Sequence, residues 1–375
     1  MASAQQQGAD DVQLHRCNPG PWGNLEYFYT FLEAPDHIME LINTPSEQTI
    51  WGFPGKTPDE ILRFLEEAGM EKSAIEDAFQ RSNAFQLGTY YKLYPSAKSV
   101  IELKPESRLA IYRELRRSTS NRLHRNPVVI ESGDVQKWFR HSNLSAETIS
   151  LIEKLCYRVG NTLMFSDTPV LLNGVEDDKQ DRALLKSLTR TRSLIVRLRV
   201  TPNTDFNALG KYWNSGLEQK DLLPILKSYA MSPAINAIDL AHLLPPTPRK
   251  YIYTFPSPEL GIDGIYPDSF WTALNFFNYL PTEEFDHQET ITAYFRNTFV
   301  EVPSPTQFGD VILINDAETR ATRHACIYIA DDIVYTKNSR SIMAPFMLMK
   351  LSDLLARFGA AGRQNISTWR RISPQ

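Results

Sequence analysis

The stretch Arg323-His324-Ala325-Cys326-Ile327-Tyr328-Ile329-Ala330-Asp331-Asp332-Ile333-Val334-Tyr335-Thr336-Lys337-Asn338 sets the expected architecture of the last third of the chain. Its two runs of β-branched and aromatic residues are joined by Ala330-Asp331-Asp332, a pattern typical of a β-hairpin. Upstream, Gly309-Asp310-Val311-Ile312-Leu313-Ile314 predicts another strand, and a helix is expected from Asp268 to Leu280. This part therefore predicts a helix followed by an antiparallel sheet.

Three short motifs, taken in chain order, resemble those of the NlpC-type cysteine peptidases, a papain-like family. Pro267-Asp268-Ser269-Phe270-Trp271 opens a helix where the family has Asp-Cys, and Gly309-Asp310 begins the next strand. His324 to Tyr328 is similar to the family's His-x-Gly-Ile-Tyr. The resemblance covers roughly the last third of the chain. It implies an α+β fold with an antiparallel sheet and a helix that carries the nucleophile in its first turn.

Ser269 stands where this family has its nucleophilic Cys. A helix N-terminus favours a thiolate through its dipole and free N–H groups, which are also suited to an oxyanion hole, and Asp268 is a natural N-cap. A hydroxyl lacks the low pKa of a thiol. Three interpretations stay open: an engineered exchange of Cys for Ser, a natural pseudoenzyme, and a working serine nucleophile. No Gly-x-Ser-x-Gly motif surrounds Ser269 to support the last of these.

His324 is the expected base, because the resemblance places it at the start of the strand that faces the nucleophile. The family commonly orients this base from the next strand, which makes Thr336 or Asn338 the third catalytic candidate. Both point to the same side of a strand, whereas Lys337 points to the other side and has no acceptor. Cys326 lies two residues after His324 at the family's small Gly position, and we expect a buried packing role for it.

Two further residues are candidates for substrate binding. Tyr251 resembles the Tyr that begins the family's element before the nucleophile, although Thr254-Phe255 replaces Gly-Gly there, and aromatic packing is the alternative. Asp268 is the second candidate. The segment from Ser339 to Met349 is interpreted either as a wall of a substrate groove or as core.

Composition limits the other function classes. The net charge of −4 is not gathered in long runs of one sign, so nucleic acid is not an expected partner. No run of about 18 apolar residues predicts an integral membrane segment. Three cysteines are too few and too scattered for a disulfide framework, and no His-x-x-x-His or Cys-x-x-Cys motif predicts a metal. We therefore expect neither a metal nor a cofactor.

A chain of 375 residues predicts two or three domains at about 150 residues each. We expect a flexible tail at 1–20, a mostly helical region of unknown role at 21–245, and the NlpC-like domain at 246–375. The boundary is placed at Leu244-Pro245-Pro246-Thr247-Pro248, because prolines end helices and favour extended backbone. Within the helical region, Thr57 and Glu60 predict a capping box, and residues 234–244 predict a short helix.

The sequence thus predicts a cysteine-peptidase-like amide hydrolase, with a peptide or cell-wall fragment as the substrate that the resemblance implies. The alternative is a non-catalytic peptide-binding module. The same resemblance implies a periplasmic or extracellular location, with the cytoplasm as the alternative. The sequence makes no prediction of oligomeric state.

Overall fold

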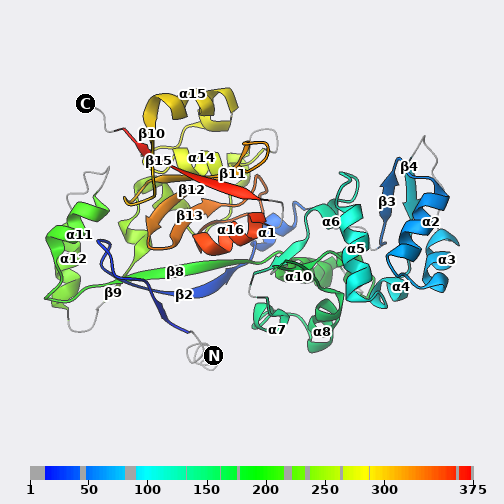
Figure 1. Ribbon diagram of the computed structural model, residues 1–375. Helices are drawn as coiled ribbons and strands as arrows, with labels where there is room; N and C mark the ends of the chain where they lie inside the picture. Colours follow the sequence, from blue (N-terminus) through cyan, green and yellow to red (C-terminus); the bar gives the residue numbers. More distant parts are fainter. Residues whose placement is uncertain are drawn as a thin grey trace. The chain divides into compact units, whose positions relative to one another are not determined.

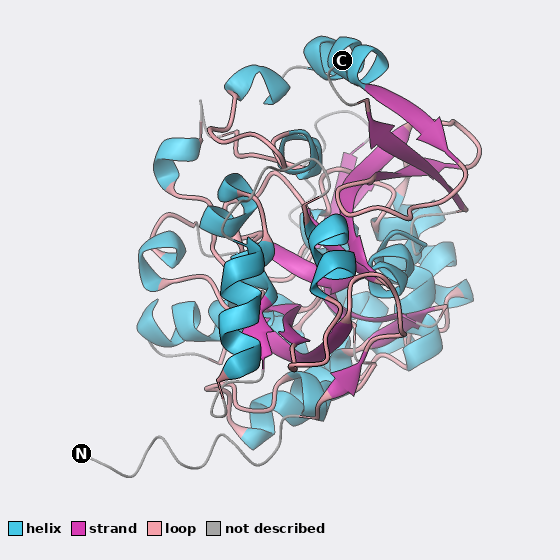
Figure 2. Ribbon diagram, turned by 90° about the vertical axis from the view of Figure 1, so that its left-hand side faces the viewer, coloured by secondary structure: helices cyan, strands magenta, loops and turns pink. Residues whose placement is uncertain are grey.

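The computed structural model of the protein describes residues 13–42, 48–80, 90–131, 133–160, 162–174, 178–214, 222–232, 237–261, 265–286, 288–359 and 363–372. Helices and antiparallel strands both occur along this chain (Figures 1 and 2), so the expected α+β class is confirmed. Two compact units are present. The first joins the described residues up to Ala34 to those from Arg190 onward, and the second spans Pro35–Thr189.

The main sheet of the first unit has six antiparallel strands, in the order β10-β15-β11-β12-β13-β14. Their bounds are β10 Phe299–Val302, β11 Val311–Asp316, β12 Thr322–Ala330, β13 Ile333–Lys337, β14 Phe346–Lys350 and β15 Gln364–Arg371. Three of them, β11, β12 and β13, lie where the sequence predicts strands, and the hairpin is formed by β12 and β13. The strand β14 was not predicted, and it forms the edge of the sheet next to β13.

Each face of this sheet packs against its own helix. Side chains of α14 (Ser269–Leu274) join the core that contains Ala325, Ile327 and Tyr335. Side chains of α16 (Leu351–Gly359) pack instead with Cys326 and Tyr328 on the opposite face. Since neighbouring residues of a strand point to opposite faces, β12 presents its odd-numbered side chains to α14 and its even-numbered ones to α16.

A second sheet connects the N-terminal segment to this unit, in the order β1-β2-β8-β9. Its strands are β1 His15–Arg16, β2 Asn24–Leu32, β8 Thr191–Arg199 and β9 Ala237–Asp239. The strands β2 and β8 pair along their whole length, from Asn24–Arg199 to Leu32–Thr191. This long-range pairing explains why the units divide near 34 and 190, whereas the sequence placed the domain boundary at 245.

Three local predictions for this unit differ from the structure. Residues 1–12 of the expected flexible tail lie outside the described part, but residues 15–16 form β1, paired with β2. In the helix expected at 234–244, residues 237–239 form β9 instead, and a 3-10 turn follows. The proline-rich segment begins the helix α13 (Pro246–Tyr251), because a proline is compatible with the first helical turn, where no N–H donor is needed.

The remaining helices of the first unit surround these sheets. They are α11 Phe206–Trp213, α12 Leu222–Met231, η1 Leu240–Leu243, η2 Pro258–Leu260, η3 Glu283–Asp286 and α15 Gln288–Thr298. The helix α14 is shorter than expected. The sequence predicted a helix that extends to Leu280, and the observed helix ends at Leu274.

The second unit mixes short helices with two small sheets, so the region 21–245 is less helical than expected. Its elements are α1 Asp36–Met39, β3 Trp51–Pro54, α2 Pro58–Glu67, α3 Lys72–Gln80, β4 Tyr90–Leu93, α4 Ala97–Ile101, α5 Pro105–Leu115, α6 Arg122–Arg125, β5 Val128–Ile130, α7 Val135–Trp138, α8 Ala146–Leu155, β6 Tyr157–Val159, β7 Thr162–Phe165, α9 Thr168–Leu172 and α10 Asp178–Leu188. The capping box predicted at Thr57 and Glu60 is confirmed at the start of α2.

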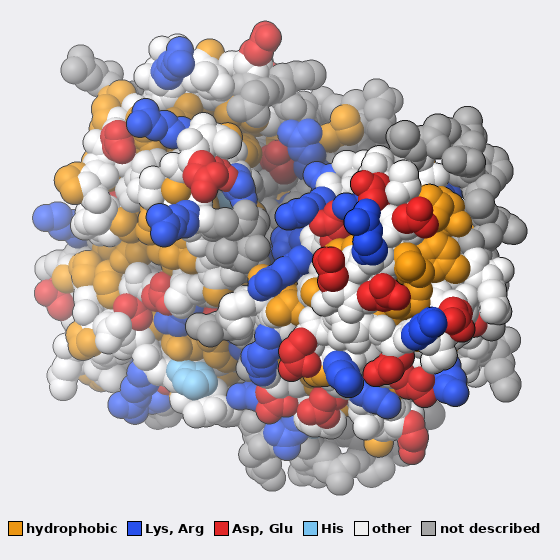
Figure 3. Space-filling model, turned by 45° about the vertical axis from the view of Figure 1, so that its right-hand side comes forward, with side chains coloured by type: hydrophobic (Ala, Val, Ile, Leu, Met, Phe, Trp, Pro, Cys, Tyr) orange, Lys and Arg blue, Asp and Glu red, His pale blue; other side chains and the backbone are white. Residues whose placement is uncertain are grey.

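On the face shown in Figure 3, Lys and Arg side chains lie interspersed with Asp and Glu.

Candidate active site

The first turn of α14 is organised by the Asp268 carboxylate. Its Oδ1 accepts hydrogen bonds from the backbone N–H groups of Phe270 and Trp271, at 2.9 and 3.0 Å. Its Oδ2 accepts a hydrogen bond from Nε of Arg340, at 3.0 Å. The sequence expected Asp268 to cap the helix, which is confirmed. However, the N–H groups of Phe270 and Trp271, expected to be free for an oxyanion hole, are occupied by this cap.

Ser269 lies directly after the cap, and its side chain reaches the backbone of β12. The N–H of Ala325 donates a hydrogen bond to Ser269 Oγ over 3.3 Å. This donor is available because the pairing of β12 with β13 ends at Ile327–Tyr335, which leaves Ala325 without a strand partner on that side. The Ser269 hydroxyl therefore bonds to the residue that directly follows His324 in the chain.

His324 forms a buried pair with Thr336 of the neighbouring strand. The distance from His324 Nε2 to Thr336 Oγ1 is 2.7 Å, and the two side chains are 2% and 0% exposed. Burial, followed by the charge of Arg357, lowers the pKa of His324 to about 3. The imidazole is therefore neutral at neutral pH, and the structure brings together the expected base and one of its two expected orienting groups.

Ser269 and His324 approach the sheet from its two faces. The Ser269 hydroxyl comes from the side of α14, whereas the His324 ring packs against Phe358 of α16, with ring centroids 4.7 Å apart. Within the described structure, no hydrogen bond joins Ser269 to His324. The structure therefore places Ser269 beside the strand that carries His324 but does not bring the expected nucleophile and base together, because their side chains lie on opposite faces of the sheet.

Asn338, the other candidate for the orienting group, lies at the end of this network. Its Oδ1 accepts a long hydrogen bond from Thr336 Oγ1 at 3.5 Å, and its Nδ2 lies 3.2 Å from Met349 Sδ. No hydrogen bond links Asn338 to His324 within the described residues. Thr336 is therefore the group that contacts the imidazole, and Asn338 contacts it only through Thr336.

Cys326 shares the face of His324, as its position two residues on requires. It is fully buried, and burial raises the pKa of its thiol far above the usual value. A thiol in this state is protonated and inert near neutral pH. The expected role as a small buried residue fits this environment.

Lys337 was passed over in the sequence, yet it is the one fully buried lysine of the described chain. Its Nζ donates hydrogen bonds to the backbone carbonyls of Ser339 and Ser341, at 2.5 and 2.9 Å. Burial lowers the pKa of Lys337 to about 7, and the charge of Asp268 opposes that shift. The alternation of β13 had placed this residue on the face opposite Thr336, but nothing in the sequence pattern signalled its burial.

Tyr251, the other substrate-binding candidate besides Asp268, lies in an aromatic cluster. Its ring centroid lies 5.9 Å from that of Trp271 and 5.1 Å from that of Phe346, and the residue is 8% exposed. Phe346 belongs to β14, within the segment interpreted as groove wall or core. The residues Phe346 to Met349 are all buried, which matches the core interpretation.

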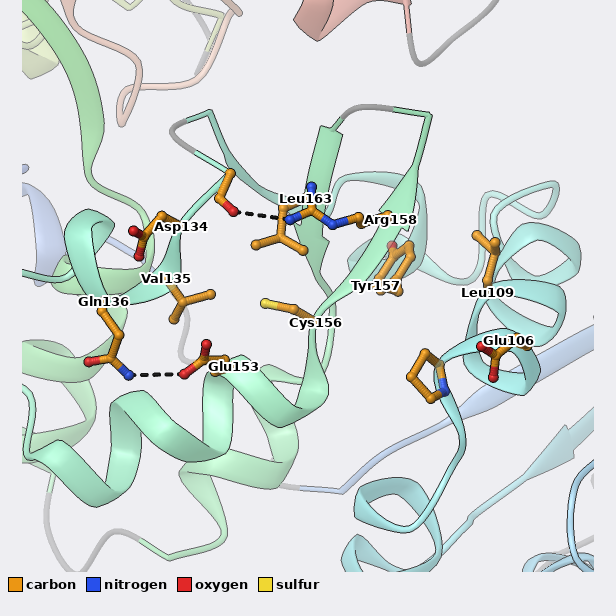
Figure 4. Close-up of a pocket in the computed structure, with 12 residues that line it drawn as sticks. Glu106, Leu109, Asp134, Val135, Gln136, Glu153, Cys156, Tyr157, Arg158 and Leu163 are labelled. Atoms are coloured by element: carbon orange, nitrogen blue, oxygen red, sulfur yellow. Dashed lines mark hydrogen bonds between the residues drawn. The ribbon is translucent and has the colours of Figure 1, made fainter.

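The second unit contains cavities that the sequence did not predict. One of about 770 Å³ lies between α5, α7, α8 and the β6–β7 pair (Figure 4), with Cys156 and Tyr157 on its wall. Arg158 donates to the carbonyl of Gly133, and Gln136 donates to Glu153, both drawn in Figure 4. Another of about 590 Å³ contains His124 in its lining. These residues are scattered through the sequence, and no motif unites them.

Comparisons with protein-family models, with curated proteins and with solved structures found no match for this chain. Among the helices that the structure describes, none combines the length and apolarity needed to cross a membrane. In the same described residues, His, Cys, Asp and Glu side chains do not gather in threes to form a metal site.

Proposed function

We propose that the last third of the chain is a papain-like amide hydrolase domain of the NlpC type, in which Ser269 takes the place of the nucleophilic Cys. The buried hydrogen bond between His324 Nε2 and Thr336 Oγ1 is the observation that supports this best. It supplies a base that is held in one orientation by the neighbouring strand. The contact of Ser269 Oγ with the N–H of Ala325 adds support, because it puts residue 269 beside that strand.

The proposed chemistry is acyl transfer to residue 269. The side chain at 269 attacks the carbonyl carbon of an amide and His324 accepts its proton, a step that requires the imidazole to turn from the α16 face of the sheet toward residue 269. The same imidazole then protonates the leaving amine. When Thr336 Oγ1 accepts the proton on Nε2, the basic nitrogen of His324 is Nδ1. Water subsequently hydrolyses the acyl group and regenerates the side chain.

The substrate class follows from the resemblance in the sequence. Peptides of the bacterial cell wall are the first choice, and other amides are compatible with the same chemistry. Because that substrate class is found there, we propose a location in the periplasm or outside the cell, with the cytoplasm as the alternative.

A non-catalytic peptide-binding module is the second candidate, and the burial of the two side chains weighs against catalysis. Ser269 is 5% exposed and His324 is 2% exposed, so a substrate reaches neither side chain in this conformation. An imidazole with a pKa of about 3 is also a weak base near neutral pH, where an effective catalyst has a pKa close to the pH. A hydroxyl in place of a thiol lowers reactivity further.

The variant Ser269→Cys separates the two candidates. With isolated wall peptides as substrate, the hydrolase proposal predicts cleavage by this variant and loss of cleavage when His324→Gln is added. The control Cys326→Ala tests whether the native buried thiol contributes, and we expect it to leave the rate unchanged. Binding of the same peptides without cleavage by Ser269→Cys would favour the binding module, and neither binding nor cleavage would contradict both candidates.

A further inference from the structure

The second unit holds a buried histidine whose Nε2 has no hydrogen-bond partner among the described residues. His124 of α6 is 4% exposed, and its Nε2 is enclosed by protein yet bonds to no described residue. Its ring packs edge-on against Tyr112, with centroids 4.6 Å apart. Buried polar groups in native proteins almost always have a partner, and an orphan often marks a missing water or ligand.

His124 belongs to the lining of the cavity of about 590 Å³. Its Nε2 is closed off from solvent, so a turn of the ring is needed to present this nitrogen to a ligand in the cavity. This volume falls in the range of small-molecule sites, about 300 to 1,000 Å³, and far exceeds the roughly 30 Å³ of one water. The lining is part apolar and part polar. Its residues are Ile42, Gln48, Thr49, Ile50, Ser120, Asn121, Arg122, Leu123, His124, Asn126, Ser166, Asp167 and Pro169.

The buried charge in this lining is already compensated within the protein. Asp167 accepts a hydrogen bond from Tyr112 at 2.5 Å and forms an ion pair with the buried Arg108 at 3.4 Å. A ligand therefore does not need a positive charge to balance Asp167. The only other charged side chain in the lining, Arg122, is solvent-exposed.

Two other buried polar residues of the lining, Asn121 and Ser166, have partners. Asn121 Nδ2 donates to the carbonyls of Gly52 and Leu115, and its Oδ1 accepts from the N–H of Gly52. Ser166 Oγ lies 2.8 Å from the hydroxyl of Tyr157. The His124 nitrogen is thus the only buried side-chain atom of this described lining without a partner.

Burial also fixes the state of the imidazole. It lowers the pKa of His124 to about 3, so the ring is neutral at physiological pH. A neutral imidazole nitrogen either donates or accepts one hydrogen bond, depending on the tautomer. Hydroxyl and amide groups match both possibilities, whereas an ammonium group offers only donors.

We propose that this cavity is a binding site for a small neutral molecule that presents a hydroxyl or amide group to His124 Nε2 and an apolar part to Ile50, Leu123 and Pro169. This site lies within the second unit, and the proposal does not depend on any activity at Ser269. A neutral ligand is specified because the cavity offers no uncompensated buried charge.

The test uses the full-length protein and a matched set of probes. N-acetyl-leucine amide is neutral, N-acetyl-leucine is anionic and leucine amide is cationic, while N-acetylglucosamine provides neutral hydroxyls with one amide. Binding is followed by calorimetry and by the ¹⁵N resonances of the histidine rings. We expect a neutral probe to bind with a Kd below about 1 mM, to move the His124 resonance, and to bind at least about tenfold more tightly than the charged probes.

Two variants identify the site of binding. His124→Phe removes the unpaired nitrogen. Ile50→Trp fills the cavity with a larger side chain. Because Ile50 is partly exposed, the protein does not need to repack its core around the new tryptophan, and a loss of binding in this variant reports on the cavity. Each is expected to weaken binding at least about tenfold, whereas His242→Gln at an exposed position leaves it unchanged. Failure of every neutral probe to move the His124 resonance, equal binding of charged probes, or unchanged binding in Ile50→Trp would overturn the proposal.

Discussion

The variant Thr336→Val tests whether the hydroxyl of Thr336 holds His324 in place. Valine has nearly the same shape as threonine, so the exchange removes the hydrogen bond without opening a cavity. The imidazole is left with an unpaired nitrogen, because His324 is 2% exposed and Thr336 is 0% exposed. Leaving a buried polar group unsatisfied costs about 1–3 kcal/mol, and we expect a loss of that size in the free energy of unfolding.

The measurement is urea unfolding followed by tryptophan fluorescence, with the change taken from the midpoint while the slope stays constant. The matched control is Thr368→Val on β15, since Thr368 is 6% exposed and its hydroxyl bonds to no described side chain. We expect this control to change stability by less than about 0.5 kcal/mol.

A double-mutant cycle with His324→Leu isolates the pair. If the hydrogen bond is the cause, the effects of Thr336→Val and His324→Leu are not additive, and the coupling energy is about 1–2 kcal/mol. Additive effects, or a loss in Thr336→Val no larger than in Thr368→Val, would refute the assignment of Thr336 as the partner of His324.

Three other predictions concern the same unit. In the folded protein the pKa of His324 is about 3, so between pH 6 and pH 4 only the unfolded chain binds a proton at this residue. The free energy of unfolding of the wild type should therefore fall by about 1.4 kcal/mol per pH unit more than that of His324→Gln. Parallel stability curves for the two proteins would contradict the lowered pKa. Asp268→Ala removes the helix cap and should lower the free energy of unfolding by about 1–2 kcal/mol, as measured by thermal unfolding. Asp268→Asn keeps a capping oxygen and should lower it by less. Equal losses in the two variants would show that the charge of Asp268, and not its cap, stabilises the protein. Cys326 is buried, so it should resist iodoacetamide in the native protein and react in urea. Mass spectrometry of the labelled peptides measures this, and labelling of Cys326 in the native protein would contradict its burial.

The hairpin and the strands beside it were predictable, because each is a short apolar run bounded by turn residues. The sequence expected β12 and β13 on either side of Ala330-Asp331-Asp332, and the structure places them there. The sequence also limited the hydrogen-bond partner expected for the His324 imidazole to two residues. Counting along the hairpin gave Thr336 or Asn338, and side-chain alternation then excluded Lys337 from that face.

Other elements depend on contacts that no local pattern contains. The strand β2 lies in the region 21–245 that the sequence predicted to be mostly helical. Its partner β8 lies more than 150 residues away along the chain, and the burial of its side chains is uneven, so no local pattern indicated a strand. The strand β14 has four consecutive buried residues without alternation, a pattern that does not distinguish a strand from a core helix. Sequence therefore predicts the local hairpin better than the long-range sheet.

The arrangement of Ser269 and His324 shows the same limit. Alternation along β12 predicts that His324 and Cys326 share a face, but it does not say which face packs against α14. That choice depends on the apolar surfaces of α14 and α16, and it places the imidazole beside Phe358. The burial of Lys337 and the cavity around His124 likewise arise from residues that are distant in sequence.

The rate at which iodoacetamide alkylates the variant Ser269→Cys at pH 6 tests the proposed nucleophile position most directly. A thiol activated by its surroundings is largely ionised at this pH, whereas a free thiol with a pKa of about 8.5 is mostly protonated. Residue 269 is 5% exposed, so the hydrolase proposal requires a conformation that opens it to solvent. Because a lower pKa also reduces intrinsic nucleophilicity, the proposal then predicts alkylation about tenfold faster than that of N-acetylcysteine, and a return to the free-thiol rate when His324→Gln is added. A rate no faster than N-acetylcysteine in the unmodified His324 background would contradict the account.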